Sequence, residues 1–181
     1  KRDLFIQHPA LLTKYGLFKR FEIRLVTEFA SVKEYAVNDT STFSGISNIQ
    51  LGGKFNFLQE KGIIPKVSLI AHYSLNGLRT IPGEKDSIDG ANFRLAMSHT
   101  ISKIFSLGYN LGMDWKSFRS DPAYLYTFIP GFNINDNWQV FVEFYGFAWQ
   151  KRTPQNSIDF GVAYLINDNF KIDASAGFGL N

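Results

Sequence analysis

The sequence predicts an all-β fold, a transmembrane antiparallel up-and-down β-barrel, from alternating residues, regularly spaced turns and abundant aromatic side chains. The clearest alternation runs from Phe105 to Lys116, where odd positions are large and apolar and even positions are small or polar. Successive side chains of a strand point to opposite faces, so this stretch has one apolar and one polar face. It is longer than an ordinary strand and suits a tilted strand crossing a bilayer, which needs about 9–11 residues.

The composition excludes several classes of protein. The 181 residues suit one domain, and no run approaches the length of apolar sequence that a membrane-spanning helix needs. Aromatic residues make up 16% of the chain, including 18 Phe, which suits the faces and rims of a membrane barrel. The net charge of +3 comes without a basic run, so nucleic acid is not an expected partner. There is no Cys, which excludes disulfides, thiolate metal sites and Cys nucleophiles.

The alternation divides the chain into about ten predicted strands. Residues before Leu11 show no period, and the Ser- and Thr-rich stretch 36–47 indicates a long loop, as does the polar stretch 147–156. Pro130 removes one ladder hydrogen bond, so we expect a bulge or an early strand end there. The strands are expected at 11–17, 21–29, 49–57, 67–75, 92–98, 105–116, 124–133, 139–145, 158–164 and 170–180.

The connections between these strands alternate between short and long. In the short turns an aliphatic residue ends one strand and an aromatic residue opens the next, four positions later. The pairs are Leu17 and Phe21, Ile101 and Phe105, Ile134 and Trp138, and Ile166 and Phe170. Tight turns at one end of a sheet and long loops at the other are typical of an outer-membrane barrel. The aromatic openers are expected to form a girdle at one rim, with Tyr35, Trp115 and Tyr124 toward the other.

The second face of the predicted strands is charged, and it supplies the candidate lumen-lining residues. They are Glu22, Arg24, Glu28, Lys54, His72, Arg94, Asp114, Lys116, Glu143, Asp159, Lys171 and Asp173. With Lys66 included, acids and bases on this face are balanced. A soluble barrel would fill its interior with apolar groups, so the pattern favours lipid outside.

Two interpretations of these charges stay open. They line a pathway for a solute, or they neutralise one another and plug a narrow lumen. In the first case Arg24, Lys54, Arg94 and Lys116 are candidates to guide an anion.

Two further groups of residues fall short of a catalytic or metal site. His72 shares a face with Ser68, a pairing that is common by chance on one strand. Glu84, Asp86 and Asp89 gather in one loop but lack the ligand order of a calcium-binding loop. We therefore expect no enzymatic activity, no cofactor and no metal.

Several stretches resemble the outer-membrane family named for the meta-pathway of phenol degradation. They are LLTKYGLFKRFEIRL at 11–25, SGISNIQLGGKF at 44–55, SIDFGVAYL at 157–165 and DASAGFGLN at 173–181. The resemblance covers nearly the whole chain and implies a Gram-negative outer-membrane barrel of transporter type, with about twelve strands when intact. An opening strand and a final strand ending in an aromatic residue are missing, so we expect a single barrel domain over 1–181, incomplete at both ends.

The expected function is therefore a channel or transporter for small solutes in the bacterial outer membrane. Outer-membrane lipid and a small solute are the expected partners. The alternative is a closed structural or partner-binding barrel that transports nothing.

Overall fold

The computed structural model describes residues 2–35, 40–81, 89–118, 120–167 and 170–181. Within these ranges the chain is nearly all β-strand, with one short 3-10 turn, η1 (Asn76–Leu78). No helix in them has the length and apolar character needed to cross a bilayer. The strands are β1 (Arg2–Gln7), β2 (Leu11–Phe18), β3 (Phe21–Tyr35), β4 (Thr40–Leu58), β5 (Lys66–Ser74), β6 (Gly90–Thr100), β7 (Phe105–Trp115), β8 (Ala123–Asn133), β9 (Trp138–Trp149), β10 (Arg152–Asn167) and β11 (Phe170–Gly179).

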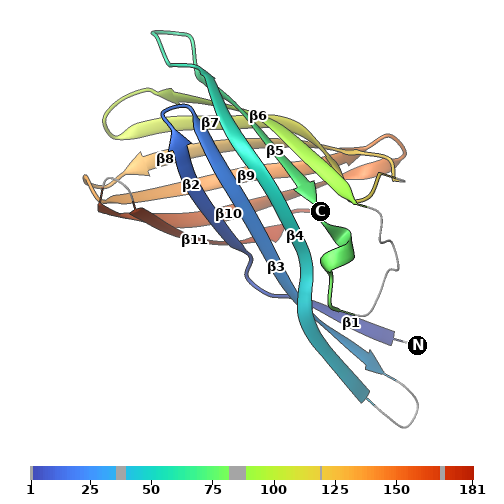
Figure 1. Ribbon diagram of the computed structural model, residues 1–181. Helices are drawn as coiled ribbons and strands as arrows, with labels where there is room; N and C mark the ends of the chain where they lie inside the picture. The colour runs from blue at the N-terminus through green and yellow to red at the C-terminus, as the bar shows by residue number, and fades with distance from the viewer. Residues whose placement is uncertain (1, 36–39, 82–88, 119, 168–169) are drawn as a thin grey trace. The chain divides into compact units, whose positions relative to one another are not determined.

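The strands form one sheet in the order β1-β3-β4-β5-β6-β7-β8-β9-β10-β11, and β2 also pairs with β3. This order confirms the predicted all-β, antiparallel up-and-down fold class (Figure 1).

The chain divides into two compact units. Unit 1 comprises Lys1–Phe55, Ile70–Phe93 and Trp115–Asp121, and unit 2 comprises Asn56–Leu69, Arg94–Asp114 and Pro122–Asn181.

Unit 1 is built on the long ladder between β3 and β4, which runs from Phe21 opposite Phe55 to Tyr35 opposite Thr40. The expected loop at 36–47 is therefore wrong from Thr40 onward, and residues 36–39 lie outside the described residues. Ser31 of β3 faces Ser44 of β4, and their hydroxyl oxygens lie 2.7 Å apart. Hydroxyl pairs across neighbouring strands stabilise a polar ladder, so a Ser- and Thr-rich stretch can form a strand here.

The strand β1 was missed, because its residues do not alternate. Leu4, Phe5 and Ile6 follow one another, and all are exposed. β1 pairs with the second half of β3, where Gln7 faces Ala30, and β2 pairs with the first half. The two are separated by a short break containing Pro9, which has no N–H to donate and is tolerated on an edge strand.

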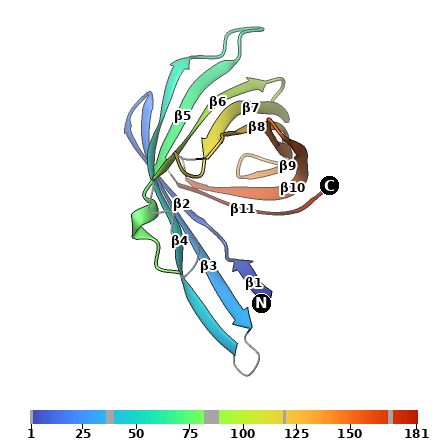
Figure 2. The same cartoon turned by 90° about the vertical axis from the view of Figure 1, so that its right-hand side faces the viewer.

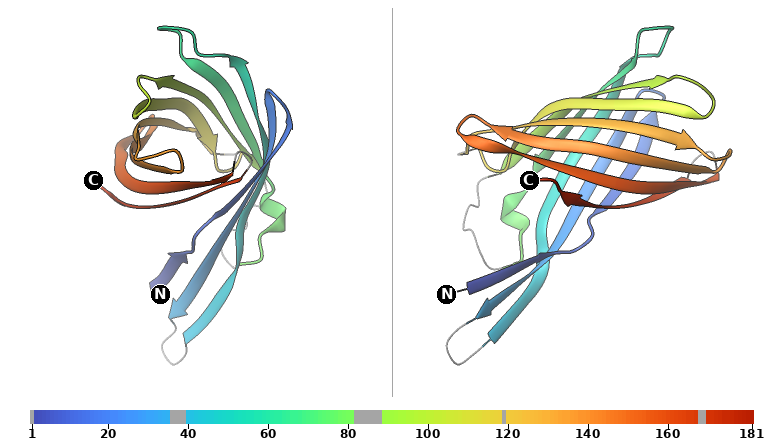
Figure 3. Two further views of the ribbon diagram at one scale, coloured as in Figure 1. Left: turned by 90° about the vertical axis from the view of Figure 1, so that its left-hand side faces the viewer. Right: turned by 180° about the vertical axis from the view of Figure 1, so that it is seen from behind.

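Unit 2 contains the most regular ladders, from the larger part of β7 to β11. Figure 3 shows β8 to β11 running side by side, and Figure 2 shows the strands from β7 to β11 curving so that one face becomes concave. The expected bulge or early end at Pro130 is wrong. Pro130 lies opposite Leu107 in the unbroken β7–β8 ladder, and β8 continues to Asn133. The pairing with β9 is interrupted at Ile129 and Pro130 and resumes at Gly131 in the same register. The φ of proline suits a strand, so its missing N–H costs only one ladder bond.

The expected polar loop at 147–156 is also wrong, because β9 and β10 extend through most of it. Phe147 pairs with Gln155, and Trp149 pairs with Arg152. The register shifts between Arg152 and Gln155, the interval that holds Pro154. A proline at a strand irregularity costs little, so polar residues and a proline did not end this hairpin.

Burial in the described residues is shallow. No large side chain among them is fully buried. The buried apolar residues are Ala30, Val67, Ala123, Leu125 and Ala163. An apolar core of large interlocking side chains, as a soluble domain would have, is therefore absent from the described part of either unit.

Candidate functional site

One face of the sheet carries large apolar side chains that are exposed; we call it the apolar face. On β8, Leu125 and Thr127 are 3% and 8% exposed, whereas Tyr124 and Phe128 are 41% and 48% exposed. Leu111 of β7 is 60% exposed. The same face exposes Tyr15, Leu25 and Leu51 in unit 1 and Phe132, Phe144, Phe160 and Phe178 in unit 2. Each unit therefore exposes large apolar side chains on this face.

Aromatic rings pair beside the short turns of unit 2, where the sequence predicted a girdle. The rings of Phe105 and Phe132 lie 5.0 Å apart between centroids, and those of Trp138 and Tyr164 lie 4.6 Å apart. In both pairs the first residue opens a strand after a short turn. The aromatic residues that open β7 and β9 therefore each pack against a ring on a neighbouring strand.

The opposite face, which we call the charged face, is locally neutralised in unit 1. Arg24 Nε lies 3.7 Å from Glu22 Oε1 along β3, and Lys54 of β4 stands opposite Glu22 in the register. Glu28 stands opposite Asn48. The side chains of Glu22, Arg24, Glu28 and Lys54 are half-buried. Unit 1 thus places acids and bases as direct neighbours.

A hydrogen-bonded chain of three side chains continues the charged face of unit 1. His72 Nδ1 lies 3.0 Å from Asn92 Oδ1, and Asn92 Nδ2 donates to Gln50 Oε1 at 3.0 Å. The His72 ring covers Gly52, where a Cβ would collide with it and with the backbone of Ala71. A glycine is needed at position 52 for this close approach.

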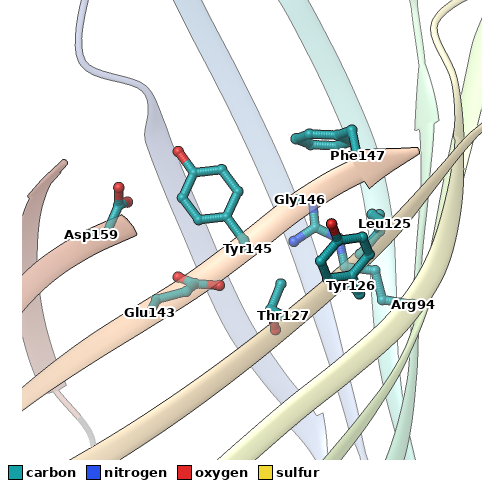
Figure 4. A pocket seen from close by; sticks show the side chains of 9 residues that line it. All are labelled: Arg94, Leu125, Tyr126, Thr127, Glu143, Tyr145, Gly146, Phe147 and Asp159. Carbon is teal, nitrogen blue, oxygen red and sulfur yellow. The ribbon is translucent and has the colours of Figure 1, made fainter. Parts of the chain in front are cut away.

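A cavity of about 190 Å³ opens on the charged face of unit 2 (Figure 4). Its charged lining comes from Arg94 of β6, Glu143 of β9 and Asp159 of β10. Glu143 and Asp159 are register partners on adjacent strands. In Figure 4 these two carboxylates lie toward one end of the cavity and Arg94 toward the other.

The three charges around this cavity interact through space, since Arg94 attracts Glu143 and Asp159 repels it. Within the described part of the chain, no hydrogen bond or ion pair joins Arg94, Glu143 or Asp159 to another residue. Arg94 Nε is buried without a hydrogen-bond partner, and so are Glu22 Oε1 and Asn48 Oδ1 on the charged face of unit 1. Both interpretations of these charges stay open: acids and bases are direct neighbours in unit 1, and charges line a cavity in unit 2.

The sequence pattern places Tyr145 on the same face as Glu143, but Phe147 and Trp149 were missed there. Tyr145, Phe147 and Trp149 alternate along β9 on the side of Glu143, and we call them the aromatic ladder. The rings of Tyr145 and Phe147 are 6.4 Å apart and edge-on, and those of Phe147 and Trp149 are 6.2 Å apart and stacked. Phe147 and Trp149 fell in the predicted loop, although their spacing from Glu143 was a signal for the same face.

The remaining predicted lumen-lining residues lie apart from the cavity lining. Asp114 is half-buried near the end of β7, opposite Ala123, and Lys116 is exposed just beyond that strand. Lys171 and Asp173 lie on β11, which is exposed along its whole length. Lys171 Nζ donates a hydrogen bond to Gln139 Oε1 at 3.2 Å.

The described residues hold no group of three or more His, Cys, Asp or Glu side chains placed to bind a metal ion. Glu84 and Asp86, weighed as calcium ligands, lie outside the described residues. Asp89 accepts hydrogen bonds from the Tyr73 hydroxyl at 2.8 Å and from the Asn76 N–H at 3.0 Å. Ser68, weighed as a partner of His72, donates to Asn56 Oδ1 at 2.5 Å.

Comparison with known proteins gives one result for nearly the whole chain. The family model described as "Putative MetA-pathway of phenol degradation" matches residues 2–181. No curated protein matches the sequence. The match extends well beyond the stretches on which the resemblance was drawn, and it confirms that resemblance. The chain belongs to this family.

Proposed function

We propose that this protein is a transmembrane β-barrel of the Gram-negative outer membrane and that it conducts small solutes. The observation that carries the proposal is the exposure of the apolar face. Leu111 and Phe160 are 60% and 52% exposed, while Leu125 and Thr127 on the other face are buried. This is the reverse of a soluble domain, in which the large apolar side chains are enclosed.

Lipid accounts for this exposure better than a protein partner does. The exposed apolar residues recur on strands from β2 to β11 rather than on one patch. Strands with an apolar outward face, aromatic side chains near their ends and a polar opposite face are typical of outer-membrane barrels. In such a barrel all backbone groups pair within the sheet, as the bilayer requires. Outer-membrane lipid is therefore the proposed partner of the apolar face.

Conduction is proposed from the charged face. Half-buried Arg, Glu and Asp side chains alternate with the apolar ones on several strands. Charges facing a water-filled interior tune which solutes pass. The described residues hold no group of side chains placed to bind a metal ion, and a non-enzymatic role is proposed. Ser31 Oγ, which lies 2.7 Å from His8 Nε2, also lies 2.7 Å from Ser44 Oγ and so belongs to a polar ladder.

Planar-bilayer recording of the refolded full-length protein tests this proposal. We expect discrete conductance steps whose cation preference falls in the variant Glu143→Lys with Asp159→Lys. The control Asp136→Lys reverses one charge in the same way in the exposed β8–β9 turn and should change the preference much less. Correctly folded protein that inserts but shows no steps would favour the alternative, a closed structural or partner-binding barrel.

A further inference from the structure

The cavity on the charged face of unit 2 combines features that select a particular kind of solute. It is about 190 Å³ in volume, larger than the roughly 150 Å³ that accommodates a benzene ring in an engineered protein cavity. Its lining includes two carboxylates, one guanidinium and the rings of Tyr145 and Phe147. A molecule with one small apolar or aromatic body and one charged group matches this size and lining.

The balance of charge points to the sign of that group. Glu143 and Asp159 face each other across β9 and β10, and Arg94 supplies the single positive charge. With both acids ionised the lining has a net charge of −1, because two carboxylates stand against one guanidinium. Like charges directly opposite on neighbouring strands destabilise a sheet, so a cation placed between them is favourable.

The aromatic ladder strengthens the same preference. Tyr145 and Phe147 line the cavity, and Trp149 continues the ladder to the end of β9. Aromatic faces attract ammonium and guanidinium groups and also pack against apolar bodies. Figure 4 shows Tyr145 beside the carboxylates, so a ligand held at the acids would lie against its ring.

We propose that this cavity binds a small organic ammonium ion. The ammonium group lies at Glu143 and Asp159, and the apolar body lies against Tyr145 and Phe147. Arg94 at the other end limits the site to one positive charge and rejects diamines. This inference rests on the proposed function, because it names the class of solute that the channel selects.

Calorimetry on the refolded full-length protein in detergent micelles tests the site without requiring conduction. Three probes of similar size differ in charge: 2-phenylethylamine, 2-phenylethanol and 3-phenylpropionate. We expect the amine to bind about tenfold or more tightly than the alcohol, as charge-assisted hydrogen bonds provide, and the anion to bind most weakly. Equal binding of amine and alcohol, or tightest binding of the anion, would overturn the proposal.

Variants locate the binding and correct for partitioning of the probes into micelles. Glu143→Gln with Asp159→Asn should abolish the preference for the amine, and Phe147→Ala should weaken amine and alcohol alike. Asp136→Asn, an acid in the exposed β8–β9 turn, should retain the preference. Should the double variant fail to fold, Asp159→Asn alone should lower the preference, and an unchanged preference would contradict the site.

The outcomes separate this inference from the proposed function. If the protein conducts ions but shows no preference for the amine, the channel proposal stands and the ammonium site is ruled out. If the protein binds the amine at this cavity but never conducts, the ammonium site stands and the channel proposal is ruled out.

Discussion

The charged faces of the two units share one sequence pattern but differ in the arrangement of their charged side chains. In unit 1 the Glu22–Arg24 pair and the chain from His72 through Asn92 to Gln50 join polar side chains to one another. In unit 2 Arg94, Glu143 and Asp159 surround a cavity, and no hydrogen bond or ion pair joins them to another described residue. Satisfied networks stabilise a fold, whereas unsatisfied groups around a cavity are available to a ligand. Alternation alone therefore does not tell a structural polar face from a binding one.

The largest expected effect separates the charged face from the apolar face on a single strand. Leu111→Arg should lower the free energy of unfolding by about 2–4 kcal/mol, because it places a charge in lipid near the bilayer midplane. Asn110→Arg should cost only about 1 kcal/mol, the value of the hydrogen bond from Asn110 Nδ2 to Thr127 Oγ1. Reversible urea unfolding in lipid vesicles measures both, and equal costs would contradict lipid exposure of the apolar face.

A smaller effect tests the difference between the units. Asn92→Leu removes both hydrogen bonds of a residue that is only 6% exposed, and it should cost about 1–3 kcal/mol. Glu143→Gln in unit 2 should change the unfolding free energy by less than about 0.5 kcal/mol, because no described contact is lost. The same unfolding assay applies, and a larger cost for Glu143→Gln would remove the distinction between the two charged faces.

A conductance measurement tests substitutions of one charged residue from each unit in the same variant. Arg24→Ala with Glu143→Ala removes bulk from both charged faces and should raise the single-channel conductance of the full-length protein. Asp136→Ala, in an exposed turn, is the control and should leave the conductance unchanged. An unaltered conductance in the double variant would place the constriction elsewhere.

The smallest effect concerns Glu60, an acid of unit 2 that lies outside the strands and accepts a hydrogen bond. Glu60 Oε1 accepts the Thr100 N–H at 2.6 Å, and mainly this bond holds the pKa of Glu60 below its ordinary 4.5. A lowered folded pKa contributes stability above about pH 4.5 that is lost as the pH falls through the folded value. Glu60→Gln should therefore reduce the loss of stability on acidification; an unchanged acid dependence would show that the bond contributes nothing in solution.

The sequence predicted most of the strands and both faces because alternation is a local signal. Strands with strict alternation, such as the one holding Phe105 and Leu111, were placed within one or two residues. The prediction from alternation failed where strand pairing overrides local composition. These places are β1, the Ser- and Thr-rich start of β4, and the segment around Pro154. In each case a long neighbouring strand supplies the hydrogen bonds that the segment's own residues do not indicate.

The candidate site was only partly predictable. Arg94, Glu143 and Asp159 were identified by their face, but their meeting around one cavity depends on register and curvature across strands. The aromatic ladder was missed, because Phe147 and Trp149 lie in a stretch whose polar neighbours suggested a loop. Sequence periodicity assigns a residue to a face, and the spacing along that face comes from the pairing of strands.

We propose that the two faces of the sheet meet different solvents, and site-directed spin labelling along β8 distinguishes those solvents residue by residue. The protein has no Cys, so single cysteines placed at Tyr124, Leu125, Tyr126, Thr127 and Phe128 can be labelled without background. In lipid vesicles, labels at 124, 126 and 128 should be reached by oxygen dissolved in the bilayer. Labels at 125 and 127 should instead favour a water-soluble nickel complex, giving two profiles with period two and opposite phase. Profiles that rise and fall together, or a cooperative fold with the same exposure in plain buffer, would contradict the claim.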